Sequence, residues 1–120
     1  MGRPVVHWEI SAKDGKAIQS FYSKLFDWKI DANNPMNYGM VSPEGQGGIG
    51  GGIFQAQDGM PAYVTFYVHV DELQPYLDKA EKLGGKTIMP PTPIPDVGSV
   101  ALFADPEGHC IGLFKGSLQS

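Results

Sequence analysis

The order of strand-like and helix-like segments constrains this chain most. A strand-like segment at residues 4–10 precedes a helical pattern that begins after Asp14, where apolar residues recur at helical spacing. Three more strand-like segments follow, and the same order begins again at Tyr63. The length fits one domain. The chain is therefore predicted to be a single α+β domain of two βαβββ modules, over about residues 1–57 and 58–120, whose sheets combine around one shared cavity.

Turn residues and apolar spacing place the other elements. Asp14 is expected to cap the first helix and Asp71 the second, and Gly84 with Gly85 is expected to end the second helix. Turns are expected at 43–45 and at 105–108, where Pro106 and Gly108 suit a tight turn. Residues 90–98 hold four prolines and are expected to form a loop, which either covers the mouth of the cavity or is a stiff connector. Further strands are predicted at 28–30, 38–41, 48–54, 63–70, 86–89, 100–104 and 110–115.

Composition limits the partners. The formal net charge of −4 argues against nucleic acid, because phosphate binding needs a concentrated basic surface. No apolar run approaches the roughly 20 residues that span a bilayer, and no secretion signal follows Met1. One cysteine excludes an internal disulfide. A cytoplasmic protein is expected, with neither nucleic acid nor membrane as a partner.

The strand at 63–70 separates by parity into two faces. Its apolar face is expected to pack against the helices and consists of Val64, Phe66, Val68 and Val70. Its other face carries polar atoms on Tyr63, Thr65, Tyr67 and His69, of which His69 is expected to reach the surface. Such a face suits a small-molecule cavity, but it also suits contact with solvent or with a second subunit.

Three motifs in order give a resemblance over nearly the whole chain. They are V-V-H-W-E-I with L-F-D-W-K-I, then Y-V-T-F-Y-V-H-V-D-E-L with L-G-G-K, and finally V-A-L-F-A-D-P-E-G-H-C-I-G-L-F. The chain resembles the vicinal oxygen chelate superfamily, also called the glyoxalase/bleomycin-resistance/dioxygenase superfamily. The resemblance implies paired βαβββ modules that form a cupped mixed sheet with the helices outside, and it implies a homodimer.

The resemblance also implies where a divalent metal would bind. Enzymes of this family usually hold it through side chains from four strands. His7 falls at the first of these positions, Thr65 at the matching position of the second module, and Gly112 in the last strand. The remaining position lies within 48–54, which has no Glu, His or Asp. One imidazole holds a metal weakly, so no cofactor is expected; a divalent metal is not supported by these positions. Gly112 is interpreted as open space where a relative carries a carboxylate.

Other chemical residues have competing interpretations. His7 and Glu9 share a face and are either a base with its orienting carboxylate or ligand contacts; alternatively, both are structural. Cys110 is expected to be a packed thiol and His109 a turn residue. The G-x-G-x-x-G match at 45–50 is not followed by a helical pattern, so it is not interpreted as a dinucleotide site.

The predicted function is metal-independent binding of a small organic ligand. The predicted pocket consists of His7, Glu9, Gly51, Tyr63, Thr65, Tyr67, Cys110 and Gly112. One alternative is a metal-dependent lyase, isomerase or dioxygenase of the glyoxalase type that uses His7 and unrecognised ligands. Another is a structural or interaction module without a ligand. Catalytic residues are not assigned.

Overall fold

A computed structural model describes residues 2–43, 47–95 and 97–116 of the protein. Within it, contacts group the residues into two units. The first unit is His7–Val64, and the second joins the residues up to Val6 with those from Thr65 onward. The early residues belong to the second unit because the His69 amide donates to the Pro4 carbonyl at 2.9 Å. Residues 44–46, which hold most of the predicted turn at 43–45 and the start of the 45–50 glycine motif, lie outside the described residues.

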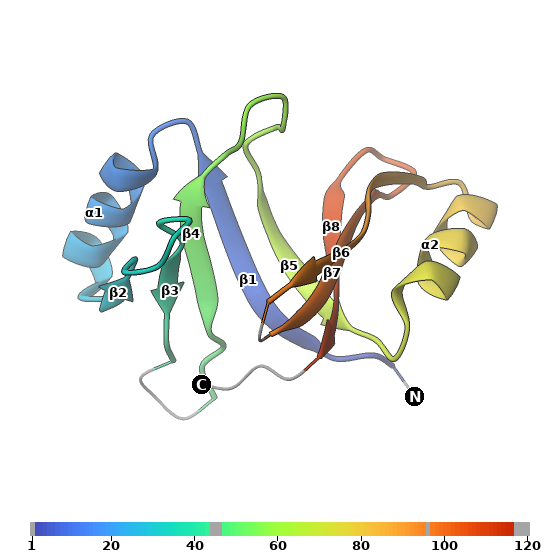
Figure 1. Ribbon diagram of the computed structural model, residues 1–120, viewed down its shortest axis with the longest axis horizontal. Coiled ribbons are helices and arrows are strands. Elements are labelled where there is room, and N and C mark those ends of the chain that lie inside the picture. Colours follow the sequence, from blue (N-terminus) through green and yellow to red (C-terminus); the bar gives the residue numbers. More distant parts are fainter. Residues whose placement is uncertain (1, 44–46, 96, 117–120) are drawn as a thin grey trace. The chain divides into compact units, whose positions relative to one another are not determined.

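The first unit follows the order strand, helix, strand, strand, strand (Figure 1). Its elements are β1 (Val5–Ala12, which starts in the second unit), α1 (Gly15–Phe26), β2 (Ile30–Asp31), β3 (Gly39–Val41) and β4 (Gly51–Gln55). The strands lie in the order β2-β3-β4-β1. β1 and β4 are parallel, whereas β3 is antiparallel to both of its neighbours, and α1 packs on β4.

The second unit repeats this topology (Figure 1). Its elements are β5 (Val64–His69, which starts in the first unit), α2 (Leu73–Lys82), β6 (Lys86–Ile94), β7 (Gly98–Ala104) and β8 (Cys110–Gly116). The strand order β5-β8-β7-β6 again places the first strand parallel to the last. The prediction of an α+β fold built from two βαβββ modules is confirmed. In the described part of the chain, neither helix is long and apolar enough to cross a membrane.

The two helices begin differently. The Asp14 carboxylate accepts the Ala17 amide at 3.0 Å, which confirms the predicted cap of α1. The prediction of Asp71 as the second cap is wrong, because the capping position of α2 is Glu72 and the Asp71 carboxylate instead accepts bonds from Arg3. Pro75 is the third residue of α2 and has no N–H to offer a capping side chain.

The predicted loop at 90–98 is wrong over most of its length. β6 continues to Ile94 through three prolines, and its pairing with β7 shifts register on either side of Met89. β6 is the outer strand of its unit's sheet, where an N–H that faces away from the partner strand is dispensable. Only residues 95–97 separate β6 from β7.

The prediction that the apolar face of β5 packs against a helix is right for two of its four residues. Val68 and Val70 do pack with Leu73 and Leu77 of α2. Val64 and Phe66, however, are 76% and 40% exposed. α2 lies over β6, β7 and β8 and starts four residues after β5 ends, so its apolar face reaches only the end of β5.

Candidate functional site

A buried carboxylate organises the polar face of the first unit. Glu9 of β1 is only 6% exposed. Its Oε2 accepts the Tyr38 hydroxyl at 2.7 Å, and its Oε1 accepts the Tyr63 hydroxyl at 2.5 Å. Tyr38 Oη also lies 2.9 Å from His7 Nε2. Four side chains from β1 and from the segments before β3 and β5 therefore form one hydrogen-bonded chain, His7–Tyr38–Glu9–Tyr63.

Local structure fixes Tyr38. The Asn34 side chain accepts the Tyr38 amide at 2.9 Å and donates to the Tyr38 carbonyl at 2.7 Å. The Tyr38 ring lies across Gly52, where any side chain would overlap it. Glycine at 52 thus allows the ring to approach the β4 backbone closely and its hydroxyl to meet the β1 side chains.

Tyr63 is held by β1 itself. Its amide donates to Ser11 Oγ at 2.9 Å, and its carbonyl accepts the Ser11 amide at 2.8 Å. The rings of Tyr38 and Tyr63 both approach Phe54 of β4, with centroids 5.2 and 6.4 Å away. The carboxylate is thus accompanied by three aromatic rings.

Burial sets the protonation of this chain. Desolvation lowers the pKa of His7, so the neutral imidazole is favoured. Desolvation, and then the negative charge of Glu9, raise the pKa of Tyr38. The tyrosine therefore stays a phenol, and its proton points to the carboxylate. A neutral imidazole and a carboxylate linked through a phenol can bind a polar group or transfer a proton.

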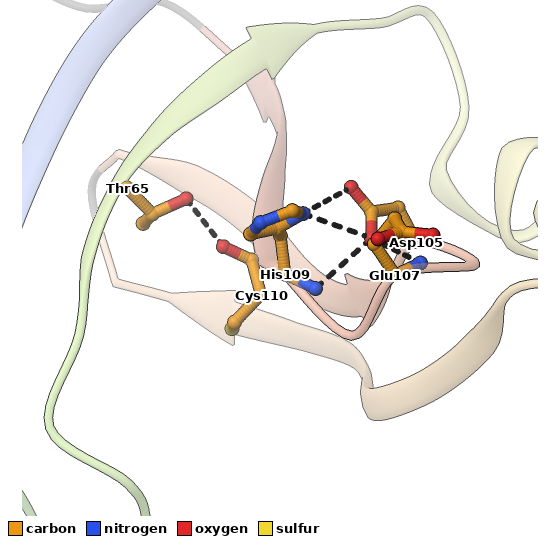
Figure 2. Close-up of polar contacts among 5 residues, drawn as sticks. All are labelled: Thr65, Asp105, Glu107, His109 and Cys110. Carbon is orange, nitrogen blue, oxygen red and sulfur yellow. Dashed lines mark hydrogen bonds and ion pairs between the residues drawn. The ribbon is translucent and has the colours of Figure 1, made fainter.

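The corresponding positions of the second unit are engaged differently. Thr65, 6% exposed, donates its hydroxyl to the Cys110 carbonyl at 2.6 Å (Figure 2). The Tyr67 ring lies over Gly112, its direct register partner, and any side chain at 112 would overlap that ring. The interpretation of Gly112 as open space is therefore wrong, because an aromatic ring fills the place of its side chain. Cys110 is half-buried.

The turn before β8 is an Asp-centred structure (Figure 2). The Asp105 carboxylate accepts the backbone amides of Glu107 and His109, both at 2.9 Å, and lies 2.9 Å from His109 Nδ1. The backbone bond from His109 is the main cause of a lowered Asp105 pKa. His109 is a turn residue, as predicted, and His69 contacts the Gly116 carbonyl at the strand end.

The predicted residues thus divide between the units. His7, Glu9, Gly51 and Tyr63 lie in the first unit, and Thr65, Tyr67, Cys110 and Gly112 in the second. A side chain on Gly51 would overlap the Trp8 ring, which packs with Trp28, so Gly51 faces away from Tyr38. Sequence reasoning missed Tyr38 and Gly52. Neighbouring residues of a strand face opposite sides, so the choice of Gly51 left out Gly52, and Tyr38 lies outside a strand, where alternation gives no signal.

The described residues include the positions at which the resemblance implies metal ligands. Over residues 2–43, 47–95 and 97–116, no three His, Cys, Asp or Glu side chains gather closely enough to hold a metal ion. The positions facing Glu9 and Tyr67 in register are Gly52 and Gly112, each covered by a tyrosine ring. A surface depression of about 310 Å³ beside α2 and Pro106 includes none of these residues.

Comparison of sequences finds curated proteins that are similar to this chain. The chain is 30% identical over 116 residues to "Putative glyoxylase CFP32" of Mycobacterium bovis, a match that covers 91% of this chain and 44% of that protein. It is 25% identical to "Anthracycline biosynthesis protein DnrV" of Streptomyces peucetius, covering 90% of this chain and 45% of that protein. The chain thus spans less than half the length of these curated relatives.

Comparison of structures supports the same fold. A glyoxalase/bleomycin resistance protein/dioxygenase superfamily member from Vibrio splendidus 12B01 superposes with a TM-score of 0.61 at 14% identity, covering 95% of this chain and 99% of that one. The model of the Glyoxalase/Bleomycin resistance protein/Dioxygenase superfamily matches residues 5–113. The chain belongs to the glyoxalase/bleomycin resistance protein/dioxygenase superfamily.

Proposed function

We propose that the protein binds a small organic ligand, without a metal ion, at the polar face of its first unit. The observation that carries this proposal is the buried Glu9 carboxylate, held by the hydroxyls of Tyr38 and Tyr63 and linked through Tyr38 to His7. Buried charges are costly unless they are hydrogen-bonded, so a polar group is kept here against the usual preference for an apolar interior. Recognition of polar ligand atoms is a reason to keep it.

The lining favours an aromatic ligand that carries hydrogen-bonding groups. Tyr38, Phe54 and Tyr63 supply ring faces and edges, which stack on planar molecules. Glu9 supplies acceptor oxygens. The relative named for anthracycline biosynthesis supports this class, because anthracyclines are fused aromatic rings with hydroxyl and amino groups.

The donors present at these positions support the metal independence of the proposed site. Protein sites for transition metals normally supply three or more nitrogen, sulfur or oxygen donors. His7 is one such donor, whereas Gly52 and Gly112 lie under tyrosine rings and the Thr65 hydroxyl donates to a backbone carbonyl.

The alternative is a glyoxalase-type enzyme that uses His7, and one observation favours it. Burial keeps His7 neutral, which is the form of imidazole that accepts a proton or binds a metal. The relative named as a glyoxylase supports the same alternative.

Fluorescence titration with daunorubicin, an intrinsically fluorescent anthracycline, tests the proposal. The wild-type protein is expected to change its fluorescence saturably, and Glu9→Gln to weaken binding roughly tenfold, as expected for loss of a charged hydrogen-bond acceptor. Tyr22→Phe is the matched control, because Tyr22 lies on α1 in the same unit and packs on Trp28. An unchanged signal, or equal affinity of wild type and Glu9→Gln, counts against the site.

Metal titration separates the two candidate functions. Zinc, nickel, manganese or iron(II) is expected to leave the melting temperature of the purified protein unchanged, since a ligand stabilises only when it binds the folded state. A stoichiometric metal that raises the melting temperature, and whose effect disappears in His7→Gln, would overturn metal independence and favour the enzyme.

A further inference from the structure

We propose that Gln19 of α1 is a positioning residue, whose side-chain amide holds the chain on both sides of Tyr38 and so keeps the Tyr38 ring over Gly52. The effect of Gln19 on ligand binding rests on the proposed function. The contacts between Gln19 and the segment around Tyr38 are a property of the protein without ligand.

The Gln19 amide donates to backbone carbonyls from two different segments. Gln19 Nε2 lies 2.7 Å from the Ile53 carbonyl of β4 and 3.2 Å from the Asn37 carbonyl. A primary amide has two N–H donors, so each of these bonds has its own hydrogen. Gln19 therefore ties the residue before Tyr38 to β4, the strand over which the Tyr38 ring lies.

The residue after Tyr38 also meets Gln19. A Cβ on Gly39 would lie 2.8 Å from Gln19 Nε2 and 2.6 Å from Ile30 Cγ2, closer than side chains pack. Glycine at 39 thus leaves room for the amide group. Gly39 pairs with Ile53 in the antiparallel ladder of β3 and β4, and Ile53 is the residue whose carbonyl accepts from Gln19. The segment is therefore held against α1 and β4 on both sides of Tyr38.

Asn34 fixes the shape of the segment but does not attach it to β4. Its side chain bonds the amide and the carbonyl of Tyr38, and its carbonyl accepts the Asn37 amide at 3.1 Å. All of these bonds lie within residues 34–38. Asn37 has a left-handed backbone with a φ of 53°, which is uncommon for residues other than glycine. The bond from Gln19 to the Asn37 carbonyl helps to hold that conformation.

The position of the ring decides whether its hydroxyl reaches the carboxylate. The Tyr38 hydroxyl donates to Glu9 Oε2 at 2.7 Å, and hydrogen bonds weaken steeply when their angle is disturbed. A displaced Tyr38 backbone would carry the hydroxyl away from Glu9. Loss of the Gln19 amide is therefore expected to act on the site through Tyr38.

NMR of the ligand-free protein tests the positioning directly. In the wild type, nuclear Overhauser signals are expected between the Gln19 side-chain amide and the α protons of Gly39. Gln19→Met has a side chain of similar length without donors and is expected to move the ring signals of Tyr38, which Tyr38→Phe assigns. The ring signals of Tyr76, in the other unit, are the control and are expected to stay unchanged.

Two NMR results would overturn the proposal. One is the absence of the Gln19–Gly39 signal in the wild type, which needs no variant to fold. The other is a folded Gln19→Met protein whose Tyr38 ring signals equal those of the wild type. A residue that only stabilised the fold would lower the melting temperature without moving the signals of one ring.

Daunorubicin affinity connects the positioning to the proposed function. Gln19→Met is expected to weaken binding roughly fivefold in the wild-type background, but about twofold or less in Tyr38→Phe, since residues that act through one another are not additive. Gln74→Met is the matched control, because the Gln74 amide donates to Asp78 within α2, and it is expected to bind as the wild type does.

Equal weakening by Gln19→Met in both backgrounds would contradict an action through Tyr38. Failure of daunorubicin to bind the wild type would count against the proposed function, whereas the NMR signals of Gln19, Gly39 and Tyr38 would still decide the positioning.

Discussion

The two units use the same backbone frame for different purposes. In each, the first strand runs parallel to the last, and the pairs compared here, Glu9 with Gly52 and Tyr67 with Gly112, have a glycine on the last strand. Each of these two glycines is covered by its own tyrosine ring. In the second unit that ring belongs to the first strand itself. In the first unit it comes from Tyr38, outside the strands, which leaves the first-strand position to a carboxylate.

Thr65 and His7 are a second pair of matching positions, and their polar atoms also have different partners. Thr65 gives its hydroxyl to a backbone carbonyl, so its polar atom stabilises the strands. His7 instead contacts the side chain of Tyr38. At this pair of positions, the polar group of the second unit therefore supports the backbone, whereas that of the first unit joins a side-chain network. The comparison indicates that chemistry is to be sought first around Glu9.

The largest expected effect comes from introducing a carboxylate on β8. Gly112→Glu would place a charged side chain on the Tyr67 ring in a buried strand, and overpacking with a buried charge is expected to lower the free energy of unfolding by about 3 kcal/mol or more. Urea denaturation measures the loss. Gly2→Glu is the control, because nothing lies within 4 Å of a side chain there. A stable Gly112→Glu protein that gains metal affinity would contradict the filled position.

Glu9→Gln is expected to have the next largest effect. The amide keeps one acceptor oxygen but turns the other into a donor that faces a tyrosine hydroxyl, so one bond to a charged group is lost, at about 2 kcal/mol. The same denaturation measurement applies, with Tyr63→Phe as a companion. If Glu9→Gln were as stable as the wild type, the two tyrosine bonds would not be holding the carboxylate.

Thr65→Val sharpens the contrast between the units. It removes a single neutral bond to the Cys110 carbonyl while keeping the shape of the side chain, so a loss of about 1 kcal/mol is expected. Daunorubicin affinity is expected to stay as in the wild type. A loss of binding in this variant would show that the second unit shares in the site, which would remove the functional contrast.

The sequence predicted the order of elements because apolar spacing and turn residues are local signals. Asp14, the β5 strand and the Asp105 turn followed from them directly. The β6 prolines misled the prediction, since an edge position is a property of the sheet and not of the segment. Tyr38 was missed for a related reason: its role depends on Gly52 and Glu9, which lie in other strands, and a single sequence carries no record of such contacts.

The smallest expected effect concerns the turn before β8, where the charge of the Asp105 carboxylate stabilises the turn. The backbone bond from His109 lowers the Asp105 pKa, so the stabilisation by this carboxylate is present above the ordinary value of about 3.9 and is lost as the pH falls through the lower folded value. Asp105→Asn keeps an acceptor oxygen for the amides of Glu107 and His109 but cannot titrate. Its urea midpoint is therefore expected to fall less steeply than that of the wild type between about pH 5 and about pH 3. Asp78→Asn, an exposed carboxylate on α2 that accepts from Gln74, is the control. Because the Asp105 side chain is 33% exposed, the difference is expected to shrink in high salt, whereas the effect of Glu9→Gln is expected to persist there, since Glu9 is buried. Equal salt sensitivity of the two variants would contradict the distinction between a partly exposed structural carboxylate and a buried one at the proposed site.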